Sequence, residues 1–458
     1  MGLTKVIEHI FRRYLPSPFT IAVLLTLLTM VLALVFTENT LGGNHFFAIL
    51  SYWENGIWNN ALLVFAYQMM LILVLGHVLV LSKPMEKLIL RITGWVTNTS
   101  SATVLVVLPT LLVSFFNWGL GLIFGAILAR KVGEYAQMKN IPINYPLIGA
   151  CGYSGLMVWH GGISGSAPLK VAEAGHLKGL LEGVADAKVL ETLPETLSTA
   201  YTIFSYWNLI VFALVALCIV ALAYYLSKRT ESTPLNLKRY EFASLERKNS
   251  EGAERLDYSP WVSTLFGILV LAAFLVQYLP ALKTLNLTPN MLNFFMLGLA
   301  ILLHGSFKRF LIAVEEAIGD TAGILIQFPL YFGIMGIMAG SGMINEVSNF
   351  FTSISTNTTL PIFTFFSAGL VNIFVPSGGG QWAIQGPLVL QSAMQLNVPL
   401  PKVIMALAYG DQVTNMLQPF WALPLLGITK LKAKEILPYT LLFMVIGSLI
   451  YIAGLLIF

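Results

Sequence analysis

The sequence predicts an all-α polytopic membrane protein, and three observations carry this prediction. First, 57% of the 458 residues are hydrophobic and 10% are charged, whereas soluble domains contain about 45–50% apolar and about 25% charged residues. Second, seven apolar segments approach the roughly 20 residues that a membrane-spanning helix needs. Third, four further apolar segments are interrupted by glycine, proline or polar residues. This composition excludes an ordinary soluble protein and an intrinsically disordered one.

The uninterrupted segments are Phe19–Phe36, Ala61–Leu81, Ile203–Leu226, Trp261–Leu279, Met291–His304, Thr321–Gly340 and Ile436–Phe458. More spans follow the first, so we expect it to be a membrane helix and not a cleaved signal peptide. Cytoplasmic loops are enriched in Lys and Arg. With residues 1–18 in the cytoplasm, 21 of the 26 Lys and Arg residues fall in cytoplasmic loops. We therefore expect residue 240 to be cytoplasmic, residue 185 periplasmic and the C-terminus periplasmic.

The loops carry few candidate sites. Segment 227–259 contains seven basic and six acidic residues and reads as a solvated cytoplasmic linker. Segment 305–320 has apolar and charged residues on opposite faces, which is typical of an interfacial helix. Both cysteines lie in apolar stretches, so neither a disulfide nor a zinc site is indicated. The net charge of +4 is too small to indicate a nucleic-acid partner.

The interrupted segments recur in one order in both halves of the chain. A re-entrant candidate, a broken span and an intact span occur at 103–130, 145–172 and 203–226, and again at 362–396, 403–428 and 436–458. The two parts of the first candidate, Thr103–Phe116 and Trp118–Arg130, are about 20 Å long as helices, too short to cross a bilayer. We therefore expect a re-entrant hairpin in each half.

One odd span, 261–279, separates the halves and would invert the second relative to the first. We expect a single transmembrane domain over 1–458, with repeat one at about 19–226 and repeat two at about 291–458. Two inverted repeats, each with a re-entrant helical hairpin and a broken transmembrane helix, are typical of secondary transporters. Their substrate sites lie where the irregular segments meet near the bilayer midplane.

The first tip and the first break contain polar and flexible residues. In FFNWGLG, the tip offers Asn117, Trp118 and Gly119, and Asn117 either binds a ligand or satisfies its own turn. In WHGGISGSAPLK, glycines and a proline prevent a continuous helix. There the candidates are Ser164, Gly165 and Ser166. His160 is either a proton carrier or ligand, or a neutral buried imidazole.

The second tip and break follow the same logic. In PSGGGQWAIQGP, the candidates are Ser377, Gly378, Gly379, Gly380 and Gln381, with Gln385 one turn further on. Consecutive glycines allow the backbone to approach a ligand closely. In AYGDQVTNMLQPFWALP, Asp411 is the one carboxylate, and Thr414 and Asn415 follow one turn later. An acidic residue at membrane depth is functional by default, although Asp411 is also suited to cap a half-helix.

These residues predict a site for a small, singly charged anion, because the four breaks contain no Lys or Arg at their centres. Helix N-termini and hydroxyls would hold the carboxylate, and Trp118, Trp382 or Phe420 would face its alkyl tail. Uptake into a negative cell is opposed by about 2.3 kcal/mol per 100 mV. A co-ion is therefore expected, with Asn117, Asp411 and Asn415 as the coupling residues. Both Na⁺ at the Asn117 and Asn415 backbone and a proton on Asp411 fit.

The most specific motifs are VPSGGGQWAIQGP, AYGDQ and NMLQPFWALP, supported by NWGLGL and SGSAPL. Through them the chain resembles the bacterial short-chain fatty acid transporter family over nearly its whole length. The resemblance implies uptake of butyrate and acetoacetate across the inner membrane. It also implies the fold of the ion-transporter superfamily, with two inverted repeats, and slightly favours Na⁺. We expect no other cofactor and leave a homodimer open.

Three alternatives remain open from the sequence. An intramembrane serine protease is suggested only by the GxSG spacing at Gly162–Gly165, without an evident base. A channel would not need paired broken helices. A carrier for another small carboxylate or a peptide-like anion is the alternative that the sequence separates least. We therefore expect a transporter and not an enzyme.

Overall fold

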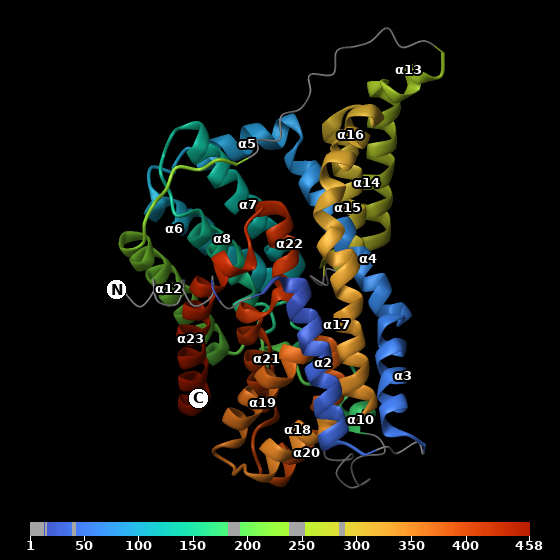
Figure 1. Cartoon of the computed structure of the whole chain (residues 1–458), viewed down its shortest axis with the longest axis vertical. Coiled ribbons are helices and arrows are strands. Elements are labelled where there is room, and N and C mark those ends of the chain that lie inside the picture. The colour runs from blue at the N-terminus through green and yellow to red at the C-terminus, as the bar shows by residue number, and fades with distance from the viewer. Residues whose placement is uncertain (1–12, 14–15, 39–42, 182–192, 238–251, 284–288) are drawn as a thin grey trace.

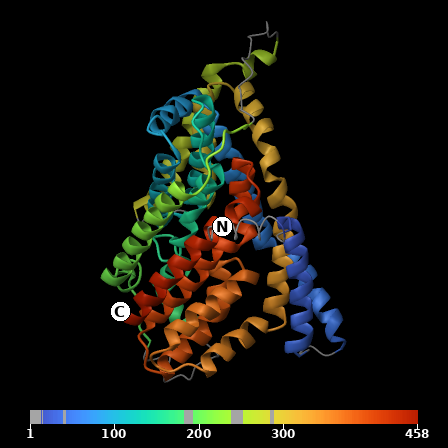
Figure 2. The ribbon, with the colours of Figure 1, turned by 60° about the vertical axis from the view of Figure 1, so that its left-hand side comes forward.

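The computed structural model is a bundle of helices (Figures 1 and 2). It describes residues 13, 16–38, 43–181, 193–237, 252–283 and 289–458. Residues 185 and 240, which the orientation prediction names, lie outside this set. Within the described chain no strand forms, and an isolated β-bridge joins Ile143 and Thr233.

The long helices of the first half are α2 (Pro18–Phe36), α3 (His45–Ile57), α4 (Asn60–Val80), α6 (Thr99–Phe116), α7 (Trp118–Met138) and α12 (Tyr206–Arg229). Those of the second half are α14 (Pro260–Lys283), α15 (Pro289–His304), α17 (Ala322–Gly340), α19 (Leu360–Phe374), α20 (Gly378–Gln395), α21 (Leu400–Thr414) and α23 (Ala433–Ile457). Shorter helices are α5 (Lys83–Thr93), α8 (Tyr145–Tyr153), α9 (Ser166–Lys170), α10 (His176–Leu181), α13 (Glu254–Asp257), α16 (Phe307–Ala317), α18 (Met343–Ser353) and α22 (Pro419–Thr429).

Seven helical segments among the described residues are long and apolar enough to cross a membrane. Six of them correspond to segments predicted from the sequence, and the predicted span at 291–304 is the shorter apolar helix α15, with 16 residues. The seventh is α6. The interfacial helix expected within 305–320 is α16, in which Ala313 and Ala317 are buried. The multi-pass architecture is therefore confirmed.

The predicted lengths of the first hairpin helices are wrong. Helix α6 has 18 residues and α7 has 21, so shortness does not prevent them from crossing. Asn98 and Ser101 form a capping box that starts α6 four residues before Thr103. Arg130 does not end α7, because its guanidinium is buried and donates to Glu134 at 2.8 Å. The apolar pattern missed both features because they depend on polar side chains.

Two hairpins nevertheless lie at opposite ends of the bundle. Helices α6 and α7 reverse direction at Asn117, and α19 and α20 reverse at residues 375–377. Figures 1 and 2 both show the first pair in the upper part of the molecule and the second pair in the lower part. The inverted relation between the two halves stays a prediction, as does the division into repeats.

Each predicted broken span follows the same local succession. In the first, α8 continues into a 3₁₀ turn (Ser154–Met157), an irregular stretch over 158–165 and α9. In the second, α21 continues into a 3₁₀ turn (Asn415–Leu417), the extended Gln418 and α22. The sequence predicted both interruptions from their glycines, prolines and polar residues.

Candidate functional site

The first tip is bonded to the first break. Asn117 caps α7, because its Oδ1 accepts from the backbone N–H of Leu120 at 2.9 Å. The backbone N–H of Trp118 donates to Ser164 Oγ at 2.9 Å. The N–H of Ile163 donates to the carbonyl of Phe115 at 2.7 Å. Asn117 thus satisfies its own turn, as its simpler interpretation predicted, and the tip and break form one unit.

The first break is also clamped to helix α21 of the other half. The backbone N–H groups of His160 and Gly161 both donate to Gln412 Oε1 at 2.9 Å. Asn208 Nδ2 donates to the Gly161 carbonyl at 3.0 Å, and the Tyr409 hydroxyl donates to Asn208 Oδ1 at 2.6 Å. Gln412 and Asn208 were not predicted. The position of Gln412 beside Asp411 is the signal that could have identified it.

His160 and Asp411 form a direct hydrogen bond between His160 Nδ1 and Asp411 Oδ2. Both side chains are fully buried. The residues come from the two separate breaks, 251 positions apart. The suggestion that Asp411 caps a half-helix is wrong. Helix α21 continues to Thr414, and the helix is interrupted only after that residue. Asp411 therefore lies inside a helix and faces the other broken span.

The second tip is bonded to the second break through Asn372, which the sequence analysis missed. Its Nδ2 donates to the Asp411 carbonyl at 2.7 Å, to Thr414 Oγ1 at 2.9 Å and to Asn415 Oδ1 at 2.7 Å. Gln418 Nε2 in turn donates to the Asn372 carbonyl. Asn372 is the only carboxamide residue within α19, and that isolation is the signal in the sequence.

Helix α20 begins against the His160–Asp411 pair. Ser377 caps it by accepting from the Gly380 N–H at 3.2 Å. A Cβ atom on Gly378 would lie 2.7 Å from Cη2 of Trp159, 2.8 Å from Cε1 of His160 and 3.1 Å from Oδ2 of Asp411. Only glycine fits such an approach without displacing its neighbours. The second tip therefore closes over residues from both breaks.

The remaining predicted site residues of the second tip differ in what they contact. A Cβ on Gly379 would lie 3.8 Å from Ser166 Oγ, so the second tip also reaches the first break at that point. Gln381 faces the interior of its own hairpin, because its Nε2 donates to the Ala368 carbonyl and to Gln385 Oε1. Gln381 and Gln385 do share a face, as predicted.

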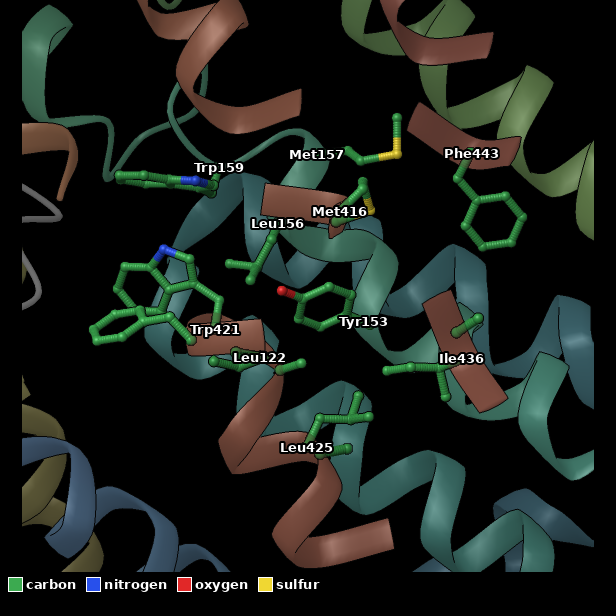
Figure 3. Close-up of a cluster of buried hydrophobic side chains, with 14 of the residues drawn as sticks. Leu122, Tyr153, Leu156, Met157, Trp159, Met416, Trp421, Leu425, Ile436 and Phe443 are labelled. Atoms are coloured by element: carbon green, nitrogen blue, oxygen red, sulfur yellow. The ribbon is translucent and has the colours of Figure 1, made fainter. Parts of the chain in front are cut away.

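An aromatic cluster borders the tips and breaks. The Trp118 ring centroid lies 5.2 Å from that of Trp421, 6.1 Å from Trp159 and 6.2 Å from Phe65. Phe420 stacks on Phe328 with 4.0 Å between centroids. In Figure 3, Trp159 and Trp421 lie on the same flank of the buried core. The cluster joins α4, α7, α17 and α22 to the first break.

Trp382 lies outside this aromatic cluster. Its Nε1 donates to His176 Nε2 at 3.0 Å, and its ring packs in a separate core with Leu390 and Leu407. Burial and the neighbouring Lys170 hold the pKa of His176 below its ordinary value, which suits the acceptor role of its ring nitrogen. Of the three residues expected to face an alkyl tail, the structure groups Trp118 with Phe420 and separates Trp382.

Several buried polar atoms of the tips and breaks have no hydrogen-bond partner among the described residues. The donors are Trp159 Nε1 and Asn415 Nδ2. The acceptors are Asn372 Oδ1, Gln381 Oε1, Asp411 Oδ1 and Gln418 Oε1. Buried polar groups are almost always hydrogen-bonded in proteins. Six of the fourteen such atoms among the described residues belong to the tips and breaks, which makes this region a candidate site for a polar ligand.

Comparisons with known proteins match the chain to one family over nearly its whole length. A model of the short chain fatty acid transporter family matches residues 2–458. Two proteins named "Putative short-chain fatty acid transporter" are each 35% identical to this chain. The alignment covers 100% of this chain and 99% of the Escherichia coli K12 protein, and 97% and 96% for the Haemophilus influenzae protein.

Among solved structures, the YdaH transporter of Alcanivorax borkumensis aligns with 95% of this chain and 98% of its own. Its TM-score is 0.44 and its identity 16%, a likeness too distant to bear on function. The family match and the two relatives, by contrast, extend over essentially the whole sequence. The chain therefore belongs to the short-chain fatty acid transporter family.

Proposed function

We propose that this protein imports short-chain monocarboxylates of the butyrate and acetoacetate type across the bacterial inner membrane, by symport with a cation. Family membership supports a transporter of short-chain fatty acids. The Lys and Arg distribution supports a cytoplasmic N-terminus and a periplasmic C-terminus. The direction of transport rests on the coupling argument, because a cation moving down its gradient would draw the anion inward.

The observation that carries this proposal is that buried hydrogen-bond donors without a partner among the described residues lie beside an aromatic cluster. Trp159 Nε1 is a buried N–H without a partner in the described part of the chain, and the Trp159 ring neighbours that of Trp118 at 6.1 Å. A carboxylate accepting from Trp159 would place a short alkyl tail among Trp118, Trp421 and Phe65. These rings offer an apolar surface against which a tail of a few carbons would pack.

Backbone donors extend this proposed carboxylate site. Helix α22 begins at Pro419, and Gln418 makes no side-chain capping bond to it. Uncapped N–H groups at a helix start attract anions. Asn415, one turn earlier, adds a second unpaired side-chain donor. Of the site residues predicted from the sequence, Ser164, Ser377 and Thr414 have hydroxyls that already accept hydrogen bonds, and we assign them to shaping the site.

Carriers for other small carboxylates or peptide-like anions are the second candidate class. The test is counterflow in proteoliposomes with a panel of linear monocarboxylates of increasing length, a dicarboxylate and a dipeptide. Protein-free liposomes measure the leak of neutral acid. We expect exchange to be strongest for monocarboxylates of about three to five carbons, because the family is described as transporting short-chain fatty acids. Preference for the dicarboxylate or dipeptide would replace this substrate assignment.

The serine protease alternative finds no support in the site. Ser164 Oγ accepts from the Trp118 N–H. Both ring nitrogens of His160 are engaged elsewhere, with Asp411 and with the Ala167 N–H. A nucleophilic serine needs a base within hydrogen-bond reach. We infer that these residues serve binding and coupling.

A further inference from the structure

The protonation state of His160 follows from its two hydrogen bonds. The backbone N–H of Ala167 donates to His160 Nε2 at 3.1 Å, so that nitrogen carries a lone pair. The ring proton therefore sits on Nδ1 and points at Asp411 Oδ2. In this arrangement the imidazole is neutral. When Asp411 is ionised, the pair as a whole carries one negative charge.

Among the described residues no Lys or Arg is recorded in an ion pair with Asp411, and the basic residue of α21 itself, Lys402, lies in the first turn of that helix. Helices α19 and α20 and the 3₁₀ turns after α8 and α21, all packed against α21, contain no titratable side chain. Helix α9 carries Lys170, whose half-exposed ammonium pairs with Glu173. Helix α23 brings Tyr451, whose hydroxyl donates to the Met157 carbonyl, and Lys434, Glu435 and Tyr439 in its first two turns. On α21 itself, the Tyr409 hydroxyl donates to Asn208.

Asp411 has one oxygen available for a cation. Its Oδ2 receives the imidazole, while its Oδ1 is buried and has no partner among the described residues. A lone buried carboxylate is expensive unless it is paired or neutralised. A proton on Oδ1 would remove the charge and leave the bond to His160 in place. The pair is thus built to hold one additional proton.

The carbonyls predicted to bind Na⁺ are already engaged. The Asn117 carbonyl accepts from the Gly121 N–H at 2.9 Å. The Asn415 carbonyl accepts from the Tyr153 hydroxyl at 2.7 Å and from the Gln418 N–H at 3.1 Å. A coordinated Na⁺ needs free oxygen ligands, such as unwound backbone carbonyls. The two carbonyls first expected to bind Na⁺ therefore do not form a ready-made Na⁺ site.

We propose that the His160–Asp411 pair carries the coupling proton, which binds Asp411 Oδ1 together with the substrate anion and leaves with it. This inference rests on the proposed function and specifies its coupling ion. One proton and one carboxylate form a neutral load, so the membrane potential no longer opposes entry. No bond other than that of the transferred proton forms or breaks.

The geometry also connects this pair to the substrate. The Trp159 ring stacks on His160, with 4.5 Å between centroids and 19° between planes, and its other neighbour is Trp118 of the aromatic cluster. A Cβ atom on Gly378 would meet Trp159, His160 and Asp411 at once. A substrate that reorients Trp159 would therefore shift the proton site and the second tip together.

The experiment measures proton uptake on substrate binding. Acetoacetate is titrated into the purified full chain by calorimetry, in buffers of different ionisation enthalpy, across a pH series and in choline chloride. We expect binding without Na⁺, with uptake rising to about one proton per acetoacetate at the alkaline end, as linkage requires. Asp411→Asn should bind with uptake near zero. The control Glu346→Gln, an exposed carboxylate, should match the unmodified protein.

The outcomes separate the two proposals. Binding by the unmodified protein without proton uptake at any pH, or binding that requires Na⁺, overturns the proton assignment and leaves the substrate class standing. Unchanged proton uptake in Asp411→Asn moves the proton to another group and also overturns it. If acetoacetate and butyrate both fail to bind, the proposed function itself is wrong. The unmodified protein decides these points even if Asp411→Asn does not fold.

Discussion

Gly378 begins helix α20 directly against His160, such that a Cβ atom at position 378 would lie 2.8 Å from the imidazole Cε1. The two residues belong to different halves of the chain, and the contact brings a hairpin tip onto a helix break. A transporter that closes one gate over its site needs such a contact, because the tip must seal the site without distorting it. We therefore expect transport to be sensitive to substitution of Gly378.

Substitution of Gly378 by Ala is expected to slow acetoacetate exchange roughly 5- to 150-fold, because overpacking typically costs about 1–3 kcal/mol. The comparison is Gly379→Ala, whose new Cβ would meet only ordinary contacts near Ser166 at 3.8 Å. Initial rates in proteoliposomes at matched protein content measure both. Equal losses in the two variants would mean that the tip does not close against His160.

Trp159→Phe tests the proposed carboxylate donor. The change keeps an aromatic ring against His160 but removes the unpaired indole N–H. A hydrogen bond to a charged group contributes about 1.5–3 kcal/mol, so the apparent KM for acetoacetate should rise roughly 10- to 100-fold. Trp95→Phe, at an indole that is 74% exposed, is the control. An unchanged KM in Trp159→Phe would place the carboxylate elsewhere.

Asp411→Asn should separate coupling from exchange. The amide keeps the size of the side chain but cannot take up the coupling proton. We expect accumulation of acetoacetate driven by an acidic exterior to fall to the level of protein-free liposomes, while equilibrium exchange persists at a reduced rate. Acetoacetate suits this assay because it is a stronger acid than butyric acid and leaks less as the neutral form. Full accumulation by the variant would leave Asp411 with a structural role only.

Orientation can be tested at described positions near those first predicted. In a chain whose Cys151 and Cys218 are replaced by Ser, single cysteines are introduced at the exposed residues Thr196 and Glu254. An impermeant maleimide added to intact spheroplasts should label the cysteine at 196, and the one at 254 only after lysis. The reverse pattern would contradict the orientation derived from the Lys and Arg distribution.

The sequence predicted most of the fold because lipid allows few solutions. Apolar length marks the spans, and glycine and proline mark the breaks, since both act locally on the helix. The limits of α6 and α7 were missed because they depend on the Asn98 cap and on the ion pair of Arg130 with Glu134. Neither interaction changes the apolar pattern.

The site was predicted in part for the same reason. Asp411 and His160 stand out as polar residues at membrane depth, but their bond joins positions 251 apart, and no local pattern encodes it. Asn372 and Gln412 act by bonding backbone groups of the opposite segment, so their roles depend on the packed fold. Trp382 was predicted to face the substrate because it lies beside the second tip in the sequence. Its indole instead donates to His176, a contact that its sequence position did not reveal.

Counterflow is the most direct test of whether this protein is a carrier for short-chain monocarboxylates. Proteoliposomes are loaded with unlabelled acetoacetate and diluted into a trace of labelled acetoacetate, without any ion gradient. We expect a transient accumulation of label above equilibrium, abolished when the internal acetoacetate is omitted and absent from protein-free liposomes. Label that only equilibrates would indicate a channel, and label that enters no faster than in protein-free liposomes would contradict the account.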